Sequence, residues 1–374
     1  MLTWPIAGLT AQVAKIAEAT GWDGLLVTDT QCLAAEAFVQ LALCVAATQR
    51  IRLGTGVTNP VTRDVALMAG GFNTLQQESN GRMSLGIGRG DSSLAHIGRK
   101  AAPLSVLETF LVRLQRYLRG EIVDRDGFSS RLVTHAAHLP KVPVDIAGTG
   151  PRVIAMAARH AEGLTLGVGA NPERIAAKVR ETEAGLAAAG RSRAGFTISA
   201  YVNVGVADRI EEARELVRGG ASVTARFSGM HGGSGSDGLT LVERDAVLAL
   251  ADRYDMAWHG SSQAPHARAL PDAFLDGFAA IGDAARVTER LRAIAATGVD
   301  RIVMIGGSLG IEMERVQRSL LAHERVTNAR RPRCGGSPPS ASDRAAPLGR
   351  RRAGPARSHR CRRSRRSRAS PAAP

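Results

Sequence analysis

The chain has 374 residues, of which 44% are hydrophobic and only 4% aromatic, a composition that can bury a large core built from Ala, Val, Leu and Ile. The net charge of +15 is uneven, because residues 329–374 contain 14 arginines and one aspartate and leave only +2 for residues 1–328. A nearly neutral body gives no support to nucleic-acid binding, and no stretch reaches the roughly 18 apolar residues that a membrane span needs.

Short apolar runs alternate with longer amphipathic segments along the body of the chain. Strands are expected at residues 23–28, 51–58, 82–87, 142–147, 163–168, 196–206 and 300–305. Helices are expected at residues 9–20, 34–49, 65–79, 103–119, 151–161, 172–189, 210–227, 239–255, 271–278 and 284–297. Residues 228–238 are rich in Gly and Ser and are expected to form a mobile loop.

Strict alternation of strands and helices predicts a parallel α/β sheet with helical crossovers. Seven strands fit a (β/α)₈ TIM barrel whose first strand is shortened or missing, with Leu2, Thr3 and Trp4 as its last residues. The alternative is an open α/β sheet. We expect one barrel domain over residues 1–328.

The segment 329–374 has almost no large apolar residues, so we expect a disordered Arg/Ser/Pro-rich tail. One interpretation makes it a nucleic-acid-binding or membrane-surface arm, since arginine runs bind phosphates. The other, which we favour, gives it no function, because no aromatic residues are interleaved with the arginines.

The cysteines and histidines give no sign of a metal site. Four cysteines form no Cys-x-x-Cys pair, and residues 1–5 lack the charged start of a signal peptide, so we expect a cytoplasmic protein. We expect seven of the histidines to be surface or loop residues rather than ligands, namely His96, His135, His138, His160, His231, His259 and His266.

In a TIM barrel the active site lies at the carboxyl ends of the strands. The third strand ends in Gly54-Thr55-Gly56-Val57-Thr58-Asn59-Pro60, whose glycines favour a bulge or a close approach of backbone to a ligand, and whose Thr55, Thr58 and Asn59 add polar groups. A plain strand-to-loop turn is the alternative. The fourth strand ends in Gly86-Ile87-Gly88-Arg89-Gly90-Asp91, a weak dinucleotide fingerprint with no conventional helix start directly after it.

Asp91 is a candidate for proton transfer beside a cofactor ring, or a loop residue that caps a turn.

A helix start follows the fifth strand and contains Gly148, Thr149, Gly150, Pro151 and Arg152. Because the free amides of a helix start bind anions, we expect a phosphate site there rather than an ordinary capped helix. Gly167 and Val168 lie in a second small-residue turn on the same rim. Asp29 follows the second strand and is expected to face the substrate.

Five stretches together resemble the bacterial luciferase-like superfamily of flavin and deazaflavin oxidoreductases, and within it the coenzyme F420-dependent branch that includes methylenetetrahydromethanopterin reductase. They are GWDGLLVTDTQ (21–31), ATQRIRLGTGVTNPVTRD (47–64), SNGRMSLGIGRGDSSLAHIG (79–98), PVDIAGTGPRVIAMAARHAEGL (143–164) and FAAIGDAARVTERLRAIAATGVDRIVMIGG (278–307). TGVTNP followed at this spacing by LGIGRGD is the more specific part.

This resemblance implies a TIM barrel with a non-prolyl cis peptide around Thr55-Gly56-Val57, beneath the cofactor ring. It also implies a cofactor phosphate at Thr149 to Arg152 and an acidic residue, Asp91, beside the ring. The chain departs from the family pattern after the second strand, where Asp29-Thr30 replaces the usual Asp-His. The first strand carries an active-site acid in the pterin reductases and is shortened or missing here, so pterin reductase activity is not supported.

The resulting hypothesis is an F420-dependent oxidoreductase that transfers hydride between F420 and a small organic substrate at a CH–NH or CH–OH group, with Asp29 or Asp91 handling a proton. An FMN-dependent luciferase-like monooxygenase is the alternative on the same fold. A catalytically impaired barrel with a nucleic-acid-binding basic tail is the alternative of another class. We expect a homo-oligomer that binds no membrane.

Overall fold

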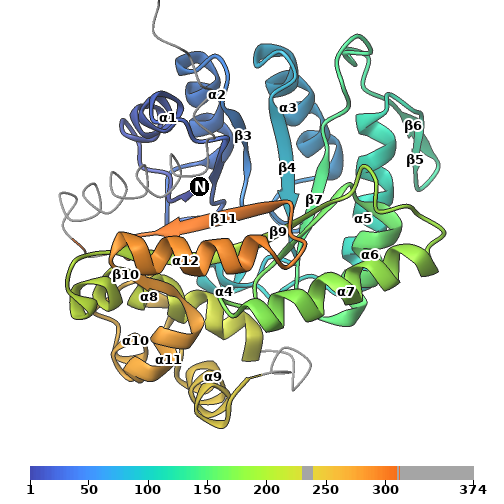
Figure 1. Ribbon diagram of the computed structural model, residues 1–374. Coiled ribbons are helices and arrows are strands. Elements are labelled where there is room, and N and C mark those ends of the chain that lie inside the picture. The colour runs from blue at the N-terminus through green and yellow to red at the C-terminus, as the bar shows by residue number, and fades with distance from the viewer. Residues whose placement is uncertain (230–238, 310, 312–374) are drawn as a thin grey trace, which may run out of the picture. The chain divides into compact units, whose positions relative to one another are not determined.

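The computed structural model describes residues 1–229, 239–309 and 311 (Figure 1). All of them belong to one compact unit, Met1–Arg331. The predicted boundary at residues 328/329, the tail 329–374 and nearly all of the loop 228–238 lie outside the described residues. No described helix is long and apolar enough to cross a membrane.

Eight parallel strands close into a barrel, which confirms the predicted fold and excludes the open sheet. Each strand pairs with its neighbours in chain order, and the pairing of the first with the last closes the ring. The strands are β1 (Leu2–Thr3), β2 (Gly24–Val27), β3 (Arg52–Thr55), β4 (Met83–Ile87), β7 (Val144–Ala147), β8 (Gly163–Leu166), β9 (Thr197–Val206) and β11 (Arg301–Gly306). A further strand, β10 (Ala280–Gly282), pairs with the last three residues of β9, beyond the part that joins β8.

The shortened first strand predicted from the sequence is present as two residues. Leu2 pairs with Leu26 of β2 on one side and with Ile305 of β11 on the other. The backbone amide of Thr28 donates to the carbonyl of Thr3 at 3.1 Å. Two residues are therefore enough to join the strands on either side, and the ring is closed at this point.

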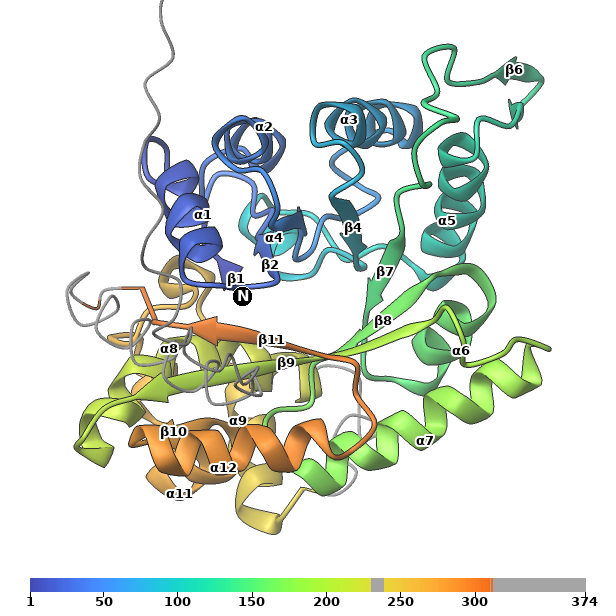
Figure 2. The same cartoon turned by 45° about the horizontal axis from the view of Figure 1, so that its top comes forward.

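Helices cover the outside of the barrel, as Figure 2 shows, with α1, α2, α3 and α5 on one side and α6, α7 and α12 on the other. The long ones are α1 (Thr10–Ala19), α2 (Ala37–Ala47), α3 (Val65–Glu78), α5 (Leu104–Leu118), α6 (Pro151–His160), α7 (Pro172–Ala188), α8 (Ile210–Gly229), α9 (Leu241–Arg253) and α12 (Ala284–Ala295). Side-chain caps begin several of them: Asp64 accepts from the amide of Ala66, and Asn171 accepts from Glu173.

Several short elements were not predicted because they are too brief to show periodicity. They are α4 (Ser92–His96), the hairpin β5 (Val123–Arg125) and β6 (Phe128–Ser130), η1 (Met256–Trp258), α10 (Pro265–Arg268) and β10, whereas α11 (Asp272–Phe278) was expected. The start of α4 at Ser92 also corrects the prediction that no helix follows the Gly88 loop directly.

Side chains alternate between the helices and the barrel axis along each strand. The outward-facing set, for example Leu25, Leu85 and Ile198, is buried in the main hydrophobic core. The inward-facing set contains several small or polar residues beside large ones such as Leu26 and Tyr201, whereas large branched residues normally fill the interior of a TIM barrel. The small or polar members include Gly54, Gly56, Ser84, Gly86, Asp145, Gly163, Thr165 and Ser199.

Candidate active site at the barrel mouth

A β-bulge joins the ends of β3 and β4, as the glycine-rich sequence predicted. Gly54 pairs with Ser84, and the next bridge joins Thr58 to Ile87. Four residues along the β3 strand therefore match three along β4, which leaves one extra residue on the β3 side. The peptide bond Gly56–Val57 within this bulge is cis and non-prolyl, at the place where the resemblance put it.

Hydrogen bonds fix this bulge against β4. The hydroxyl of Thr55 donates to the carbonyl of Gly86 at 2.8 Å and accepts from the Gly86 amide at 3.1 Å. The amide of Thr58 donates to the same Gly86 carbonyl, and the amide of Gly88 donates back to the carbonyl of Thr58, both at 2.9 Å. The buried Thr55 hydroxyl thus holds the bulge in place and has little capacity left for a ligand.

Glycines leave the room that the bulge needs. A Cβ on Gly56 would stand 2.5 Å from Leu2 Cδ1, and one on Gly88 would stand 3.1 Å from Val57 Cγ2. A Cβ on Gly86 would overlap a backbone oxygen of β3. Because a Cβ would overlap its neighbours at Gly56 and Gly86 and fit only tightly at Gly88, the mouth has a floor of backbone on which a planar group can lie.

Asp29, just beyond β2, lies in a buried network and is only 4% exposed. Its carboxylate accepts from Gln31 Nε2 and from the hydroxyl of Thr58, each at 2.7 Å, and forms an ion pair with Arg63. Arg63 also pairs with Glu36. With donors on both oxygens, this carboxylate anchors the end of the bulge.

Four buried polar atoms close to this network have no hydrogen-bond partner among the described residues. They are Thr28 Oγ1, Thr30 Oγ1, Gln31 Oε1 and Asn59 Nδ2. Buried polar atoms are nearly always paired in folded proteins, with protein, water or ligand. This cluster of donors and acceptors beside a backbone floor fits a planar ring with a polar edge.

Asp91 follows β4 and does not cap α4 with its side chain. Its carboxylate lies 3.8 Å from Arg226 of α8. Arg226 also donates to the hydroxyl of Ser92 at 3.2 Å, and its guanidinium lies 4.7 Å from the centre of the Tyr254 ring. Asp91 is therefore placed at the mouth, beside a cation that the sequence did not single out.

The predicted phosphate site lies at the rim formed by β7 and β8. Helix α6 begins at Pro151 after Gly150, and no described side chain caps it. Arg152 is exposed, and a Cβ on Gly167 would meet Thr149 at 3.8 Å, so the two rim turns adjoin. Val168 is buried, and its carbonyl accepts from Arg174 at 2.8 Å. An uncapped helix start beside Arg152 provides amides and charge for an anion.

Two of the histidines expected to be surface or loop residues are buried: His259 lies in a turn and His266 in α10. They are 6% and 5% exposed and lie with Tyr254 and Trp4 in one group. The Tyr254 hydroxyl and His259 Nδ1 are 2.7 Å apart, the Tyr254 and His266 rings are 4.2 Å apart, and the Trp4 and His259 rings 6.1 Å. Their segment has no periodicity from which burial could be predicted.

Burial fixes the protonation of this group. It raises the pKa of Tyr254, which Arg226 only partly offsets. Burial also lowers the pKa of His259 to about 4, with smaller contributions from the positive charges of Arg226, His266 and His96. Tyr254 is then a neutral phenol and His259 a neutral imidazole at physiological pH.

A second polar group lies inside the barrel, beneath the bulge. Burial raises the pKa of Asp145 to about 7, although the hydroxyl of Thr165 donates to its carboxylate at 2.6 Å and Arg301 is nearby. Burial also raises the pKa of Tyr201, and its hydroxyl would lie 3.3 Å from a Cβ on Gly56. The interior is therefore polar up to the floor of the mouth.

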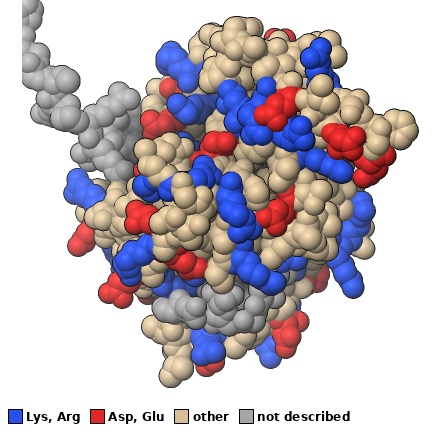
Figure 3. Space-filling view, turned by 90° about the vertical axis from the view of Figure 1, so that its right-hand side faces the viewer, with Lys and Arg blue, Asp and Glu red and all other residues tan. Residues whose placement is uncertain are grey.

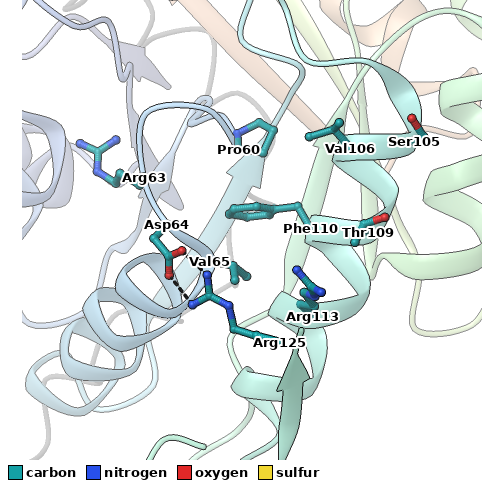
Figure 4. Close-up of a pocket in the computed structure, with 10 residues that line it drawn as sticks. All are labelled: Pro60, Arg63, Asp64, Val65, Ser105, Val106, Thr109, Phe110, Arg113 and Arg125. Carbon is teal, nitrogen blue, oxygen red and sulfur yellow. Dashed lines mark hydrogen bonds and ion pairs between the residues drawn. The ribbon is translucent and has the colours of Figure 1, made fainter. Parts of the chain in front are cut away.

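Outside the mouth, a groove of about 380 Å³ separates the start of α3 from α5 (Figure 4). Phe110 extends into it from α5, and Arg125 binds Asp64 through two hydrogen bonds, one of them 2.9 Å long. Over the face shown in Figure 3, basic and acidic side chains are interspersed. The groove shares only Pro60 and Arg63 with the region around the mouth and contains none of the predicted site residues.

The chain is similar to known proteins over most of its length. Residues 7–301 match the family described as luciferase-like monooxygenase. The 5,10-methylenetetrahydromethanopterin reductase of Archaeoglobus fulgidus is 28% identical over 310 residues, which cover 80% of this chain and 90% of the relative.

Solved structures agree in fold. The F420-dependent tetrahydromethanopterin reductase from Methanopyrus kandleri superposes with a TM-score of 0.68 at 19% identity, covering 87% of this chain and 96% of that one. An F420-dependent secondary alcohol dehydrogenase in complex with an F420–acetone adduct gives a TM-score of 0.67 at 18% identity, covering 86% and 94%. At these identities the likeness concerns the fold alone.

Proposed function

The chain belongs to the luciferase-like monooxygenase family, and on that premise we propose that it is an F420-dependent oxidoreductase that transfers hydride between F420 and a small organic substrate. The observation that carries the proposal is a glycine floor at the β3–β4 bulge combined with an uncapped helix start on the β7–β8 rim. A cofactor with a planar ring and a phosphate-bearing chain needs both. The F420-dependent enzymes among the similar proteins add support.

In this proposal the ring rests on residues around the bulge, namely Thr55, Gly56, Val57, Thr58, Asn59 and Gly88. The phosphate-bearing chain crosses to Gly148, Thr149, Gly150, Pro151 and Arg152, flanked by Gly167 and Val168. The cofactor supplies the hydride chemistry, and the protein orients it and excludes water. Asn59 Nδ2, which is buried and unpartnered among the described residues, provides a donor for the ring edge.

Asp29 and Asp91 have different surroundings, which favours different roles. Asp29 is buried and fully hydrogen-bonded, so we assign it the task of holding Thr58 and thereby the end of the bulge. Asp91 lies at the mouth with Arg226 at 3.8 Å and is the better placed of the two for contact with the substrate or for proton transfer.

An FMN-dependent monooxygenase is the second candidate, because the family's own description names that activity. Fluorescence titration of the purified protein with F420 and with FMN distinguishes the two. We expect micromolar F420 binding and weaker FMN binding. Binding of FMN without any binding of F420 would overturn the proposed function.

A matched pair of variants on α6 tests the phosphate site. Arg152→Ala removes the arginine at the start of the helix, and Arg159→Ala removes one at its other end, where it pairs with Glu108. We expect Arg152→Ala to weaken F420 binding about tenfold, the size of one charge-assisted hydrogen bond, and Arg159→Ala to leave it unchanged. Equal effects of the two would show that the phosphate lies elsewhere.

We also propose that the protein is a cytoplasmic homo-oligomer in which a second copy covers α2 and α3. The outer face of α2 is apolar, with Val39 56% and Leu43 48% exposed, and Leu67 of α3 is 65% exposed. Apolar side chains grouped on adjacent helices favour a protein partner over solvent.

A further inference from the structure

A compact set of polar and aromatic side chains lies at the barrel mouth, apart from the residues assigned to the cofactor. We call it the mouth cluster and define it as Trp4, Arg226, Tyr254, His259 and His266. It contains two buried histidines and a buried hydroxyl, although burying polar side chains costs free energy unless they pair or act. The cluster therefore needs an explanation beyond packing.

The cluster spans the carboxyl ends of three strands. Trp4 follows β1. The residues directly after His259 pair with the segment after β11, since the amide of Leu309 donates to the carbonyl of Gly260 at 2.9 Å. On the opposite side Arg226 reaches Asp91 and Ser92 after β4. The mouth cluster thus lies across the opening in which a substrate would face a ring on the bulge.

The contact between Tyr254 and His259 allows either atom to be the donor across its 2.7 Å. In the arrangement on which the proposal below rests, the neutral phenol donates and Nδ1 of the neutral imidazole accepts. The imidazole proton then resides on Nε2. Nε2 makes no hydrogen bond with any described residue, which leaves one neutral N–H donor at the mouth.

We propose that His259 is a catalytic residue whose Nε2–H binds the oxygen of a carbonyl substrate, so that the chain interconverts carbonyl compounds and the corresponding alcohols. The proposal rests on the proposed function, because it takes the hydride from reduced F420. A neutral N–H donor suits an oxygen that gains negative charge during the reaction. A cationic iminium group has no lone pair on its nitrogen to accept from such a donor, so the cluster favours CH–OH over CH–NH chemistry.

During reduction the carbonyl carbon gains hydride from reduced F420, which is thereby oxidised, and forms a C–H bond. The C=O π bond breaks, and its electron pair moves to oxygen. The oxygen takes the Nε2 proton of His259, and Nδ1 takes the phenolic proton of Tyr254. Solvent returns a proton to Tyr254 in step with this transfer, because burial disfavours the tyrosinate and the Arg226 guanidinium over its ring offsets that only in part.

The test combines variants with a spectroscopic readout on the full-length wild-type protein. His259→Gln and Tyr254→Phe are compared with His138→Gln, which alters an exposed histidine in the segment before β7. F420 affinity is measured by fluorescence, and turnover by oxidation of reduced F420 with cyclohexanone and acetone. Nitrogen-15 NMR of the histidine rings reports the tautomer between pH 5.5 and 8, with and without cyclohexanone.

We expect all three variants to bind F420 as the wild type does. His259→Gln should lose carbonyl reduction about 10²–10³-fold, as when one donor to a developing oxyanion is removed, and Tyr254→Phe roughly fivefold to tenfold, as when one hydrogen bond is lost. The His259 ring should remain an Nε2–H tautomer throughout, and cyclohexanone should shift its signal.

Three results would overturn the inference while leaving the proposed function intact. They are an Nδ1–H tautomer, wild-type turnover in His259→Gln, and F420 binding by the wild type without reduction of either ketone. Loss of F420 binding in the wild type itself would instead refute the proposed function and, with it, this role for His259.

Discussion

Asp145 offers a direct test of the polar barrel interior. Asp145→Asn keeps the shape of the side chain and removes its charge. Burial is the main reason why its pKa is about 7, compared with 3.8 for an unperturbed aspartate. The folded state therefore holds a proton that the unfolded state has lost over the whole window between these values.

The sign follows from proton linkage. Between pH 4 and 7 the folded state binds more protons than the unfolded state, so the stability of the wild type falls as the pH rises. The shift corresponds to an upper value of about 4 kcal/mol above pH 7, at 1.36 kcal/mol per unit. The variant has no carboxyl proton to lose, so its free energy of unfolding does not fall for this reason as the pH rises.

Urea denaturation at pH 5 and pH 8.5 measures the effect. At pH 5 wild type and Asp145→Asn should differ by less than about 1.5 kcal/mol, since both are neutral and can accept from Thr165. At pH 8.5 the variant should be more stable by about 2–4 kcal/mol. Asp252→Asn, on the exposed side of α9, is the control and should follow the wild type. A variant that is destabilised equally at both pH values would refute the reasoning.

Three further predictions concern the floor, the network beneath it and the outer helices. Gly86→Ala places a Cβ against a backbone oxygen of β3 and should destabilise the fold by about 1–3 kcal/mol in urea. Unchanged stability would show that the two strands separate to admit the methyl group and would refute the need for glycine there. Arg63→Met leaves Asp29 buried beside donors that do not neutralise it, which should cost about 3–5 kcal/mol near pH 7; an unchanged denaturation midpoint would contradict this. Leu43→Glu should convert the oligomer to a monomer by size-exclusion chromatography with light scattering, and a monomeric wild type would refute the assignment of that face.

The barrel could be predicted because its signals are local and repeated. Each strand is a short apolar run such as Leu25–Val27, each long helix shows a buried stripe, and caps such as Asp64 and Asn171 mark the helix starts. Even the two-residue β1 could be inferred, because seven strands leave one place open in an eight-stranded ring. Elements of three to five residues, such as α4 and β10, carry no such repeat and were missed.

Parts of the site that lie on a single strand end were also predictable. The bulge, the glycine floor and the helix start each lie within about seven consecutive residues, so the local sequence is enough to predict each of them. What the sequence could not give is the partner of each group. Arg63 on Asp29 and Arg226 on Asp91 lie 34 and 135 residues away in the chain, and nothing local marks either arginine as a partner.

The mouth cluster shows why the burial of His259 and His266 could not be predicted. Spacing rules test whether histidines share a metal, and by that test His259 and His266 are unremarkable. The role proposed for His259 depends on its burial, on its contact with the phenol of Tyr254 five residues away, and on the Arg226 cation from α8. Each is a property of the folded chain. A neutral imidazole in such a place is informative because of its protonation state, which only the packing around it determines.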